Sequence, residues 1–425
     1  MSEMPGLSRR VGDRAVPRHH WALKARRAAV ALVLLVITTS AAHAEGALSS
    51  APVGDGISHA GRLLPVAQSA PGTLLASEPL TGAPMPEGSQ AWRIEYATTA
   101  PDGSPANAVA TVLAPATLPA DPMPVIAWDH GAVGLVENCL PSATDPWKEI
   151  PALNEVIAQG WLVVSTDYQV NGDGVHPFLI GEGEARSTLD AIRAVRQMPE
   201  LQVDDRTIVW GHSQGGHAAL WTGIIAHDYA PDVTVSGIAA ISPVTGLVSL
   251  LDRQDESSAA PVLGSWLATA YSSYYPDVDY DAIVTDTARD AGKDLARRCP
   301  SDTLDGLAIG LTLRNLGSGP FLVVPPPDPF RDRLLENEPE GSIAAPIVVV
   351  QGLDDVIVLP QTTASFVEAR CAAGAAISYW LVPDQDHLGL VQPGSPLEAP
   401  LIAWTQERFA GESMEATCTE ATING

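Results

Sequence analysis

The sequence predicts an α/β fold built on one mainly parallel central sheet with helices on both faces, and three observations support this. Short apolar segments typical of strands alternate with helical patterns along most of the chain. The later strand segments are almost continuously apolar, as strands buried on both faces should be. Residues 246–345 break this alternation with several helical patterns, which indicates an inserted, largely helical cap.

Each expected strand is a short apolar run bounded by turn residues. Strands are expected at residues 91–98, 107–114, 124–128, 161–168, 207–211, 233–241, 346–352 and 376–382. Helices are expected at residues 150–159, 183–198, 214–228, 361–373 and 397–409. The core is therefore expected in two parts, residues 61–245 and 346–425, which flank the cap at residues 246–345.

The first 44 residues have the pattern of an export signal. Seven Lys and Arg residues precede an uncharged run from Ala28 to Ala42, and Ala42-His43-Ala44 follows as a small-x-small cleavage site. The run is shorter than the roughly 20 residues that span a bilayer, which favours cleavage after Ala44 over a retained anchor. The export route stays open, and residues 45–60 are expected to form a flexible leader.

The composition excludes some classes of partner. The chain has 24 Lys and Arg against 50 Asp and Glu, a formal net charge of −26. Such a surface repels nucleic acid backbones and anionic lipid headgroups, so a neutral substrate fits best. No segment after the signal approaches 18 uninterrupted apolar residues, so no stable membrane span is expected after cleavage. The oligomeric state stays open.

The cysteines indicate an oxidising compartment. All four, Cys139, Cys299, Cys371 and Cys418, follow the expected cleavage site. An even number in an exported protein predicts two disulfides, and four cysteines allow three pairings. No Cys-x-x-Cys or Cys/His ligand spacing occurs, so no metal site is expected.

The strongest catalytic signal is the G-x-S-x-G motif Gly211-His212-Ser213-Gln214-Gly215. It directly follows an expected strand and directly precedes an expected helix. This context matters because a nucleophilic serine needs a sharp strand-to-helix turn, and the glycines leave room for the backbone to fold back. The motif therefore predicts an α/β-hydrolase fold with Ser213 as the nucleophile.

The chain order in this fold is nucleophile, acid and then histidine, which restricts the other two residues. His387 is the only histidine after the strand expected to carry the acid, so it is the predicted base. Asp354 and Asp355 both follow that strand. We favour Asp355, because a G-x-x-D turn carries its carboxylate over the edge of the sheet. Asp384 and Asp386 remain less favoured alternatives, since the histidine loop would have to fold onto itself.

Two backbone N–H groups are needed to stabilise an oxyanion. Gln214, the residue after the nucleophile, is expected to supply one. The H-G-x-x-G segment after the strand at residues 124–128 is expected to supply the other, from Gly131 or Ala132. The alternative interpretation of this segment is an ordinary glycine turn.

Together these motifs resemble the secretory lipases of the α/β-hydrolase superfamily, the family typified by yeast lipase A and common among bacterial exported proteins. The resemblance covers about residues 61–410. It rests on the segments Pro71-Gly72-Thr73 before a short strand, Trp128-Asp129-His130-Gly131, Cys139-Leu140-Pro141-Ser142, Thr166-Asp167-Tyr168, His176-Pro177, Gly211-His212-Ser213-Gln214-Gly215-Gly216-His217-Ala218, and Gln351-Gly352 with Asp355 and Val358.

The resemblance implies hydrolysis of acyl esters by Ser213, Asp355 and His387 under a helical cap. It also implies that Cys139 pairs with Cys299, and Cys371 with Cys418. The family often has threonine after the His-Gly pair, where this chain has Ala132, and Gly-Leu-Gly after the Asp-Tyr pair, where it has Gln169-Val170-Asn171. Both departures lie at the rim of the expected active site, so they leave the substrate scope open.

The expected function is therefore that of a secreted serine hydrolase. It would cleave carboxylic esters, such as acyl glycerols or other lipid esters, through an acyl-enzyme intermediate and without a cofactor. An exported peptidase or amidase is the alternative, because a triad does not itself distinguish an ester from an amide. A catalytically idle binding protein is a third. The apolar residues 321–324 of the cap either line an acyl tunnel or bury the cap against the core.

Overall fold

The computed structural model describes residues 69–251, 259–316, 319–414 and 417–424. All of them belong to one unit, Pro52–Gly425. The predicted signal peptide, its cleavage after Ala44 and the predicted leader at residues 45–60 lie outside the described residues. None of the described helices is long and apolar enough to cross a lipid bilayer.

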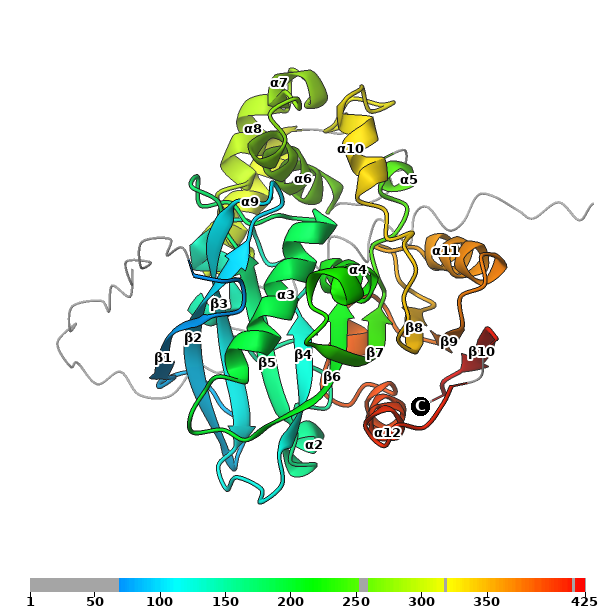
Figure 1. The fold of residues 1–425 in the computed structure, drawn as a ribbon. Coiled ribbons are helices and arrows are strands. Elements are labelled where there is room, and N and C mark those ends of the chain that lie inside the picture. Colours follow the sequence, from blue (N-terminus) through cyan, green and yellow to red (C-terminus); the bar gives the residue numbers. More distant parts are fainter. Residues whose placement is uncertain (1–68, 252–258, 317–318, 415–416, 425) are drawn as a thin grey trace, which may run out of the picture. The chain divides into compact units, whose positions relative to one another are not determined.

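The described strands form a single sheet in the order β1-β2-β3-β5-β4-β6-β7-β8-β9-β10 (Figure 1). They are β1 Leu74–Pro79, β2 Ser89–Thr99, β3 Pro105–Pro115, β4 Met123–Asp129, β5 Leu162–Gln169, β6 Val203–His212, β7 Thr234–Ile241, β8 Ile347–Gly352, β9 Ile377–Val382 and β10 Thr419–Thr422. Neighbours from β5 to β10 pair in parallel, whereas β1, β2 and β3 add antiparallel strands beside β5. The predicted mainly parallel sheet is confirmed.

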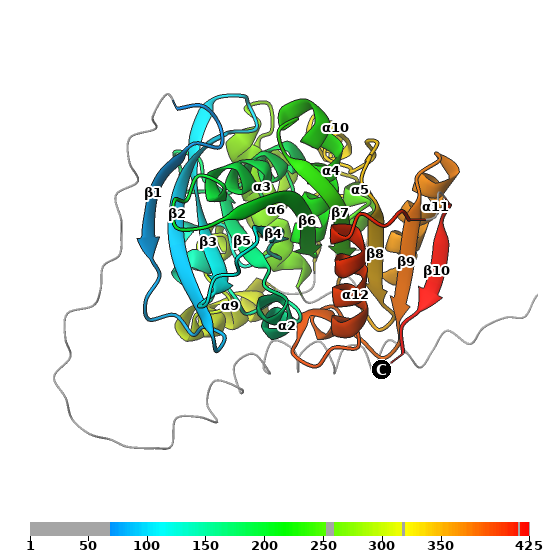
Figure 2. The ribbon, with the colours of Figure 1, turned by 60° about the horizontal axis from the view of Figure 1, so that its bottom comes forward.

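Helices cover both faces of this sheet. In chain order they are η1 Glu137–Cys139, η2 Pro141–Ala143, α2 Leu153–Ala158, α3 Gly181–Val195, α4 Gln214–Tyr229, α5 Leu247–Leu251, α6 Ala260–Tyr274, α7 Tyr280–Ile283, α8 Arg289–Leu295, α9 Thr303–Leu316, α10 Phe330–Glu336, α11 Pro360–Ala372, η4 Gly389–Val391 and α12 Glu398–Phe409. The apolar residues of α3, α4 and α11 share one buried cluster, and those of α2 and α12 share another. Figure 2 shows α12 and α2 across the sheet from α3.

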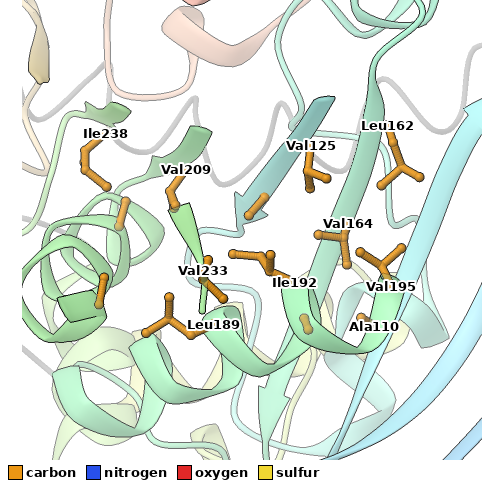
Figure 3. Packing of buried hydrophobic residues seen from close by; sticks show 14 of the residues in the cluster. Ala110, Val125, Leu162, Val164, Leu189, Ile192, Val195, Val209, Val233 and Ile238 are labelled. Carbon is orange, nitrogen blue, oxygen red and sulfur yellow. The ribbon is translucent and has the colours of Figure 1, made fainter. Parts of the chain in front are cut away.

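The packing of α3 shows how sequence spacing produces this layer. Leu189, Ile192 and Val195 recur at helical spacing and are fully buried. Figure 3 shows them against strand residues that include Val164 and Val209. Burying each such side chain stabilises the fold by about 1.5–3 kcal/mol. The layer is held mainly by this apolar contact.

The chain between β7 and β8 carries helices α5 to α10, in the segment where the cap was predicted (Figure 1). These helices share a buried cluster that includes Trp266, Tyr271 and Phe321. Phe321 fills the space beside two glycines: a Cβ on Gly264 would lie 3.0 Å from its ring, and one on Gly292 would lie 2.6 Å from it. This packing favours burial of the cap over a tunnel lining as the explanation of Phe321.

Two strands lie outside the expected set. The strand β1 follows Pro71-Gly72-Thr73, where only the family resemblance implied one. The strand β10 was not predicted, because its four residues are all exposed and show no alternation of apolar and polar side chains. It forms by pairing with the edge strand β9, next to the disulfide at Cys418. Neither the pairing of β10 with β9 nor the position of the disulfide beside it can be read from the local sequence.

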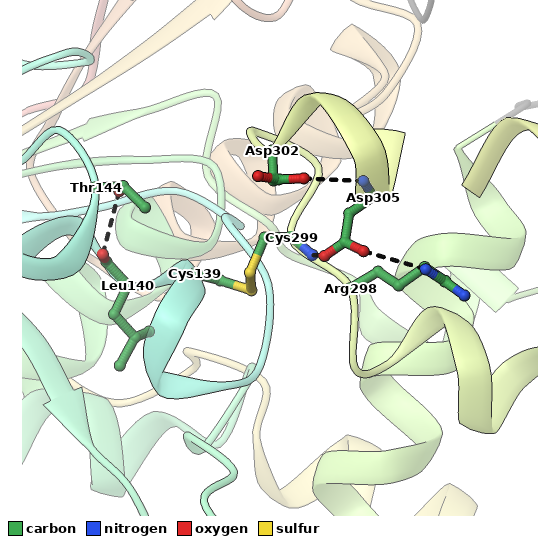
Figure 4. The surroundings of a disulfide bond; sticks show 7 residues. All are labelled: Cys139, Leu140, Thr144, Arg298, Cys299, Asp302 and Asp305. Atoms are coloured by element: carbon green, nitrogen blue, oxygen red, sulfur yellow. Dashed lines mark hydrogen bonds and ion pairs between the residues drawn. A yellow bond between two sulfur atoms is a disulfide. The ribbon is translucent and has the colours of Figure 1, made fainter. Parts of the chain in front are cut away.

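Two disulfides join the pairs that the family resemblance implied, Cys139 with Cys299 and Cys371 with Cys418. The first connects η1 to the chain after α8 and is buried (Figure 4). Gly134 has a φ of 130°, and a Cβ there would lie 2.6 Å from the sulfur of Cys139. The bridge therefore packs directly on the H-G-x-x-G segment.

We expect the two disulfides to differ in their effect on stability. They close separations of 160 and 47 residues, so loop entropy sets upper limits of about 5 and about 4 kcal/mol. Serine at both Cys139 and Cys299 should lower the free energy of unfolding more than serine at both Cys371 and Cys418, because the second bridge anchors only exposed β10. Urea unfolding without reductant measures both. A larger loss for the second pair would contradict this expectation.

Candidate active site

Ser213 lies on a sharp turn between β6 and α4. Its φ of 59° and ψ of −117° fall in a region that costs a non-glycine residue about 1–3 kcal/mol. Two backbone hydrogen bonds hold this conformation: Ser213 N–H donates to Ile241 at 2.9 Å, and its carbonyl accepts from Val244 at 3.1 Å. The strained turn, at the carboxyl end of β6, leaves Ser213 only 8% exposed.

The glycines of the motif are required by close backbone contacts. A Cβ on Gly211 would lie 2.0 Å from the carbonyl oxygen of Gly215. A Cβ on Gly215 would lie 1.8 Å from the carbonyl oxygen of Asp129. No side chain fits at either position, because real Cβ atoms do not approach other atoms so closely. The turn thus presses against the end of β4, where the H-G-x-x-G segment begins.

His387 and Asp355 are in direct contact. Nδ1 of His387 lies 2.7 Å from Oδ2 of Asp355, and both side chains are buried. The other carboxylate oxygen accepts the backbone N–H groups of Ile357 and Val358, both at 2.9 Å. The adjacent Asp354 is exposed. Of the two aspartates, the structure therefore brings Asp355 to the histidine.

The environment favours the ionised form of Asp355. Burial alone would raise the pKa of this carboxyl, but the hydrogen bond from His387, the charge of His387 and the two backbone N–H groups outweigh it and lower the pKa below its usual value. An ionised carboxylate accepts the Nδ1 proton of His387. This tautomer leaves Nε2 of His387 able to accept a proton.

His212 connects the histidine loop to the turn. Its ring lies 4.6 Å from the ring of His387, centroid to centroid, and its Nε2–H donates to the His387 carbonyl oxygen at 2.8 Å. Burial, then the charge of His387, lowers the pKa of His212 to about 3, so its ring is neutral. Among the described residues, no direct hydrogen bond joins Ser213 to His387. The link runs through His212, the residue before Ser213, which hydrogen-bonds to the His387 backbone.

The predicted oxyanion segments lie against each other. Gln214 begins α4, and the position of a Cβ on Gly131 is 3.4 Å from the carbonyl oxygen of His212. Nδ1–H of His130 donates to the carbonyl oxygen of Gly131 at 2.7 Å, which fixes the peptide plane between Gly131 and Ala132. In a trans peptide the N–H points opposite to the C=O, so the orientation of the Ala132 N–H is also fixed.

A cluster of aromatic rings surrounds His130. Tyr168 lies 4.6 Å from His130 and 6.0 Å from His176, ring centroid to ring centroid. Burial lowers the pKa of His130 to about 4, against opposing hydrogen bonds to the backbone of Gly131 and Asp167. Burial, then the nearby His130, lowers the pKa of His176 to about 3. Both histidines are therefore neutral parts of the folded core at neutral pH.

Two polar residues beside the site were not predicted. Gln351 donates to Asp355 Oδ2 at 3.3 Å and accepts from Thr363 at 2.6 Å, so it supports the carboxylate from behind. Glu149 is half-buried, and burial raises the pKa of its carboxyl. One of its carboxylate oxygens lies 3.4 Å from the position that a Cβ on Gly131 would occupy. Gln351 belongs to a segment that carried the family resemblance, whereas Glu149 belongs to no motif.

The chain is similar in sequence and in fold to known lipases. The model of the secretory lipase family matches residues 148–416. A protein of Mycobacterium tuberculosis (strain CDC 1551 / Oshkosh) described as probable inactive lipase MT1628 is 26% identical, over 81% of this chain and 80% of its own. Lipase A of Moesziomyces aphidis is 25% identical, over 77% and 74%. The structure of Candida antarctica lipase A in its closed state has a TM-score of 0.66 at 21% identity, and covers 83% of this chain and 86% of its own.

The buried histidines predict acid sensitivity. Unfolded histidine binds a proton near pH 6.5, whereas folded His176 does so only near pH 3. Between these values the unfolded state binds more protons, so stability falls as the pH falls. His176→Phe should therefore reduce the stability lost between pH 7 and pH 5 by about 2 kcal/mol. Thermal unfolding at several pH values measures this.

The exposed His227 provides the matched control for this measurement. His227→Gln should leave the pH dependence of unfolding as it is in the wild type. Equal slopes for wild type and His176→Phe would show that His176 does not contribute.

Proposed function

This chain belongs to the secretory lipase family, and from that premise we propose that it hydrolyses neutral acyl esters with Ser213 as nucleophile, His387 as base and Asp355 as orienting acid. The protein is a carboxylic ester hydrolase of the α/β-hydrolase fold. The observation that carries the residue roles is the 2.7 Å contact between His387 and Asp355, beside the strained turn of Ser213.

The proposed reaction has two steps. Ser213 Oγ attacks the ester carbonyl carbon while Nε2 of His387 takes its proton, and the alcohol then leaves with that proton. In the second step His387 takes a proton from water, which attacks the acyl carbon; the bond from this carbon to Ser213 Oγ then breaks, Oγ takes the proton back from His387, and the acid is released. Catalytic hydrogen bonds commonly close only when substrate is bound, so rotation of the Ser213 hydroxyl toward His387 is part of the proposal.

The negative oxygen formed in each step needs two oriented N–H groups. The Gln214 N–H stands at the first turn of α4, where the helix dipole also favours negative charge. For the second donor we propose Ala132 rather than Gly131. Support comes from the His130 hydrogen bond, which holds the peptide plane that contains the Ala132 N–H.

The substrate is proposed to be an acyl glycerol or another neutral lipid ester. A net charge of −26 disfavours anionic substrates. On α9, Leu304, Leu307 and Leu311 are exposed at helical spacing, an apolar face that suits lipid aggregates better than soluble amides. Membership of a secretory family and two disulfides support an extracellular location. Cleavage after Ala44 is proposed for the export signal.

The mycobacterial relative is described as a probable inactive lipase. A catalytically inactive binding protein is therefore the second candidate. Two features argue against this candidate: the strained turn at Ser213 and the buried pair of Asp355 and His387. An amidase on the same fold is the third. Ester turnover, amide turnover and covalent labelling separate the three.

The first test is hydrolysis of p-nitrophenyl esters from acetyl to palmitoyl by the secreted protein, whose first residue should be Glu45 by N-terminal sequencing. Ser213→Ala should lower kcat by about 10⁴-fold or more, because it removes the nucleophile. A fluorophosphonate probe should label the wild type and not this variant. An unlabelled wild type would favour the idle protein, and turnover of aminoacyl amides alone would favour the amidase.

The adjacent aspartates provide a matched pair for the acid. Asp355→Asn should lower kcat by about 10⁴-fold at neutral pH, since the amide no longer fixes the tautomer of His387. Asp354→Asn changes an exposed carboxylate next to it and should leave kcat within about twofold of wild type. Steady-state kinetics on one ester measures both variants. The reverse result would assign the role to Asp354.

A further inference from the structure

A buried polar cluster lies beside the serine turn, centred on Glu184 of α3, which is 0% exposed. Its Oε1 accepts the Leu179 N–H at 2.9 Å and the side-chain amide of Gln214 at 2.8 Å. Its Oε2 lies 2.9 Å from Nδ1 of His217. Glu184 therefore binds the first turn of α4 at two points. One of them is Gln214, whose backbone N–H is the proposed oxyanion donor.

The contacts determine the net charge of the Glu184–His217 pair. Nε2 of His217 lies 2.8 Å from the Asn337 carbonyl oxygen, which only accepts, so Nε2 carries a proton. A second proton must lie between Nδ1 and Oε2, because two lone pairs would repel at 2.9 Å. Whichever atom holds it, the pair as a whole is neutral. The carboxylate beside the oxyanion site thus adds no net charge there.

Asn337, directly after α10, extends this cluster into the cap. Its carbonyl oxygen also accepts Nε1–H of Trp221 at 3.0 Å. Its side-chain oxygen accepts the Gly181 N–H at 2.9 Å, at the start of α3, and its amide donates to the Tyr275 hydroxyl at 2.8 Å. A single cap residue therefore binds both core helices that carry the pair.

Within the described part of the chain, the other ionisable groups that face the pair are acids. They are Asp129 on β4, Tyr168 on β5, Tyr271 on α6 and Glu338. Burial raises the pKa of each, and none of them can supply a positive charge. Compensation of the negative charge of Glu184 therefore depends on the proton that it shares with His217.

We propose that Glu184 and His217 are positioning residues of the oxyanion site: they hold Gln214 in place and keep its surroundings free of net charge. The inference rests on the proposed function, because it assumes that the Gln214 N–H receives the developing negative oxygen. An ionised Glu184 without the shared proton would oppose that charge. Its effect falls on the transition state, and hence on kcat, more than on binding of a neutral ester.

The test compares kcat and KM of three variants on one ester at neutral pH. Glu184→Gln removes the charge at equal size and should lower kcat about tenfold at nearly unchanged KM. His217→Gln leaves the carboxylate without its shared proton. It should lower kcat about 100-fold, because an uncompensated carboxylate opposes the developing negative charge.

The double variant, with both changes, separates electrostatics from packing. It has no charge to compensate, so its kcat should exceed that of His217→Gln by about tenfold. A purely structural role predicts the opposite, a double variant worse than either single one. If His217→Gln does not fold, Gln214→Met removes only the amide held by Glu184 and should still lower kcat at unchanged KM.

Asp190→Asn is the matched control. Asp190 is another buried carboxylate of α3, but it binds Thr98, Tyr229 and Arg193 instead of the serine turn. This change should lower thermal stability and leave kcat unchanged. Single variants with wild-type kcat, or a double variant worse than both, would overturn the inference and leave the proposed function standing. A wild type that neither hydrolyses esters nor reacts with fluorophosphonate would overturn both.

Discussion

The close approach of the serine turn to the end of β4 is the constraint on which the whole site depends. At Gly215 the two backbones leave no room for a side chain, since a Cβ there would lie 1.8 Å from the Asp129 carbonyl oxygen. Beside this contact Ser213 adopts a positive φ, at a cost that its backbone hydrogen bonds help to offset. The contact also brings together the two segments proposed to supply oxyanion donors. Shape, strain and proposed chemistry therefore meet at one contact.

Burial sets the protonation states around this turn. Desolvation keeps His130, His176 and His212 neutral at neutral pH, because a charged imidazole loses more hydration than these sites replace. Asp355 is the contrasting case, since His387 and two backbone N–H groups compensate its charge. Neighbouring groups with similar burial thus reach opposite states. The difference lies in the charged groups and hydrogen-bond partners next to each side chain.

The segment between β7 and β8 contacts elements next to the serine turn. The Cys139–Cys299 bridge packs on Gly134, and the carbonyl of Asn337 binds a histidine of α4. Both contacts join the segment between β7 and β8 to elements next to the serine turn. A displacement of the cap would disturb these contacts.

Local patterns in the sequence determined the alternating elements, the mainly parallel sheet and Ser213 as a candidate, because apolar periodicity and the G-x-S-x-G motif act over a few residues. The chain order of the fold then singled out His387. The pairing of the cysteines came from family resemblance. The sequence favoured Asp355 over Asp354, and the tertiary structure places Asp355 in contact with His387. Only the tertiary structure decided that β10 pairs with β9 and that Glu184 lies beside Gln214. Each of these contacts joins residues that are far apart in the chain. Packing and burial bring such residues together, and no periodic pattern in the sequence reveals it.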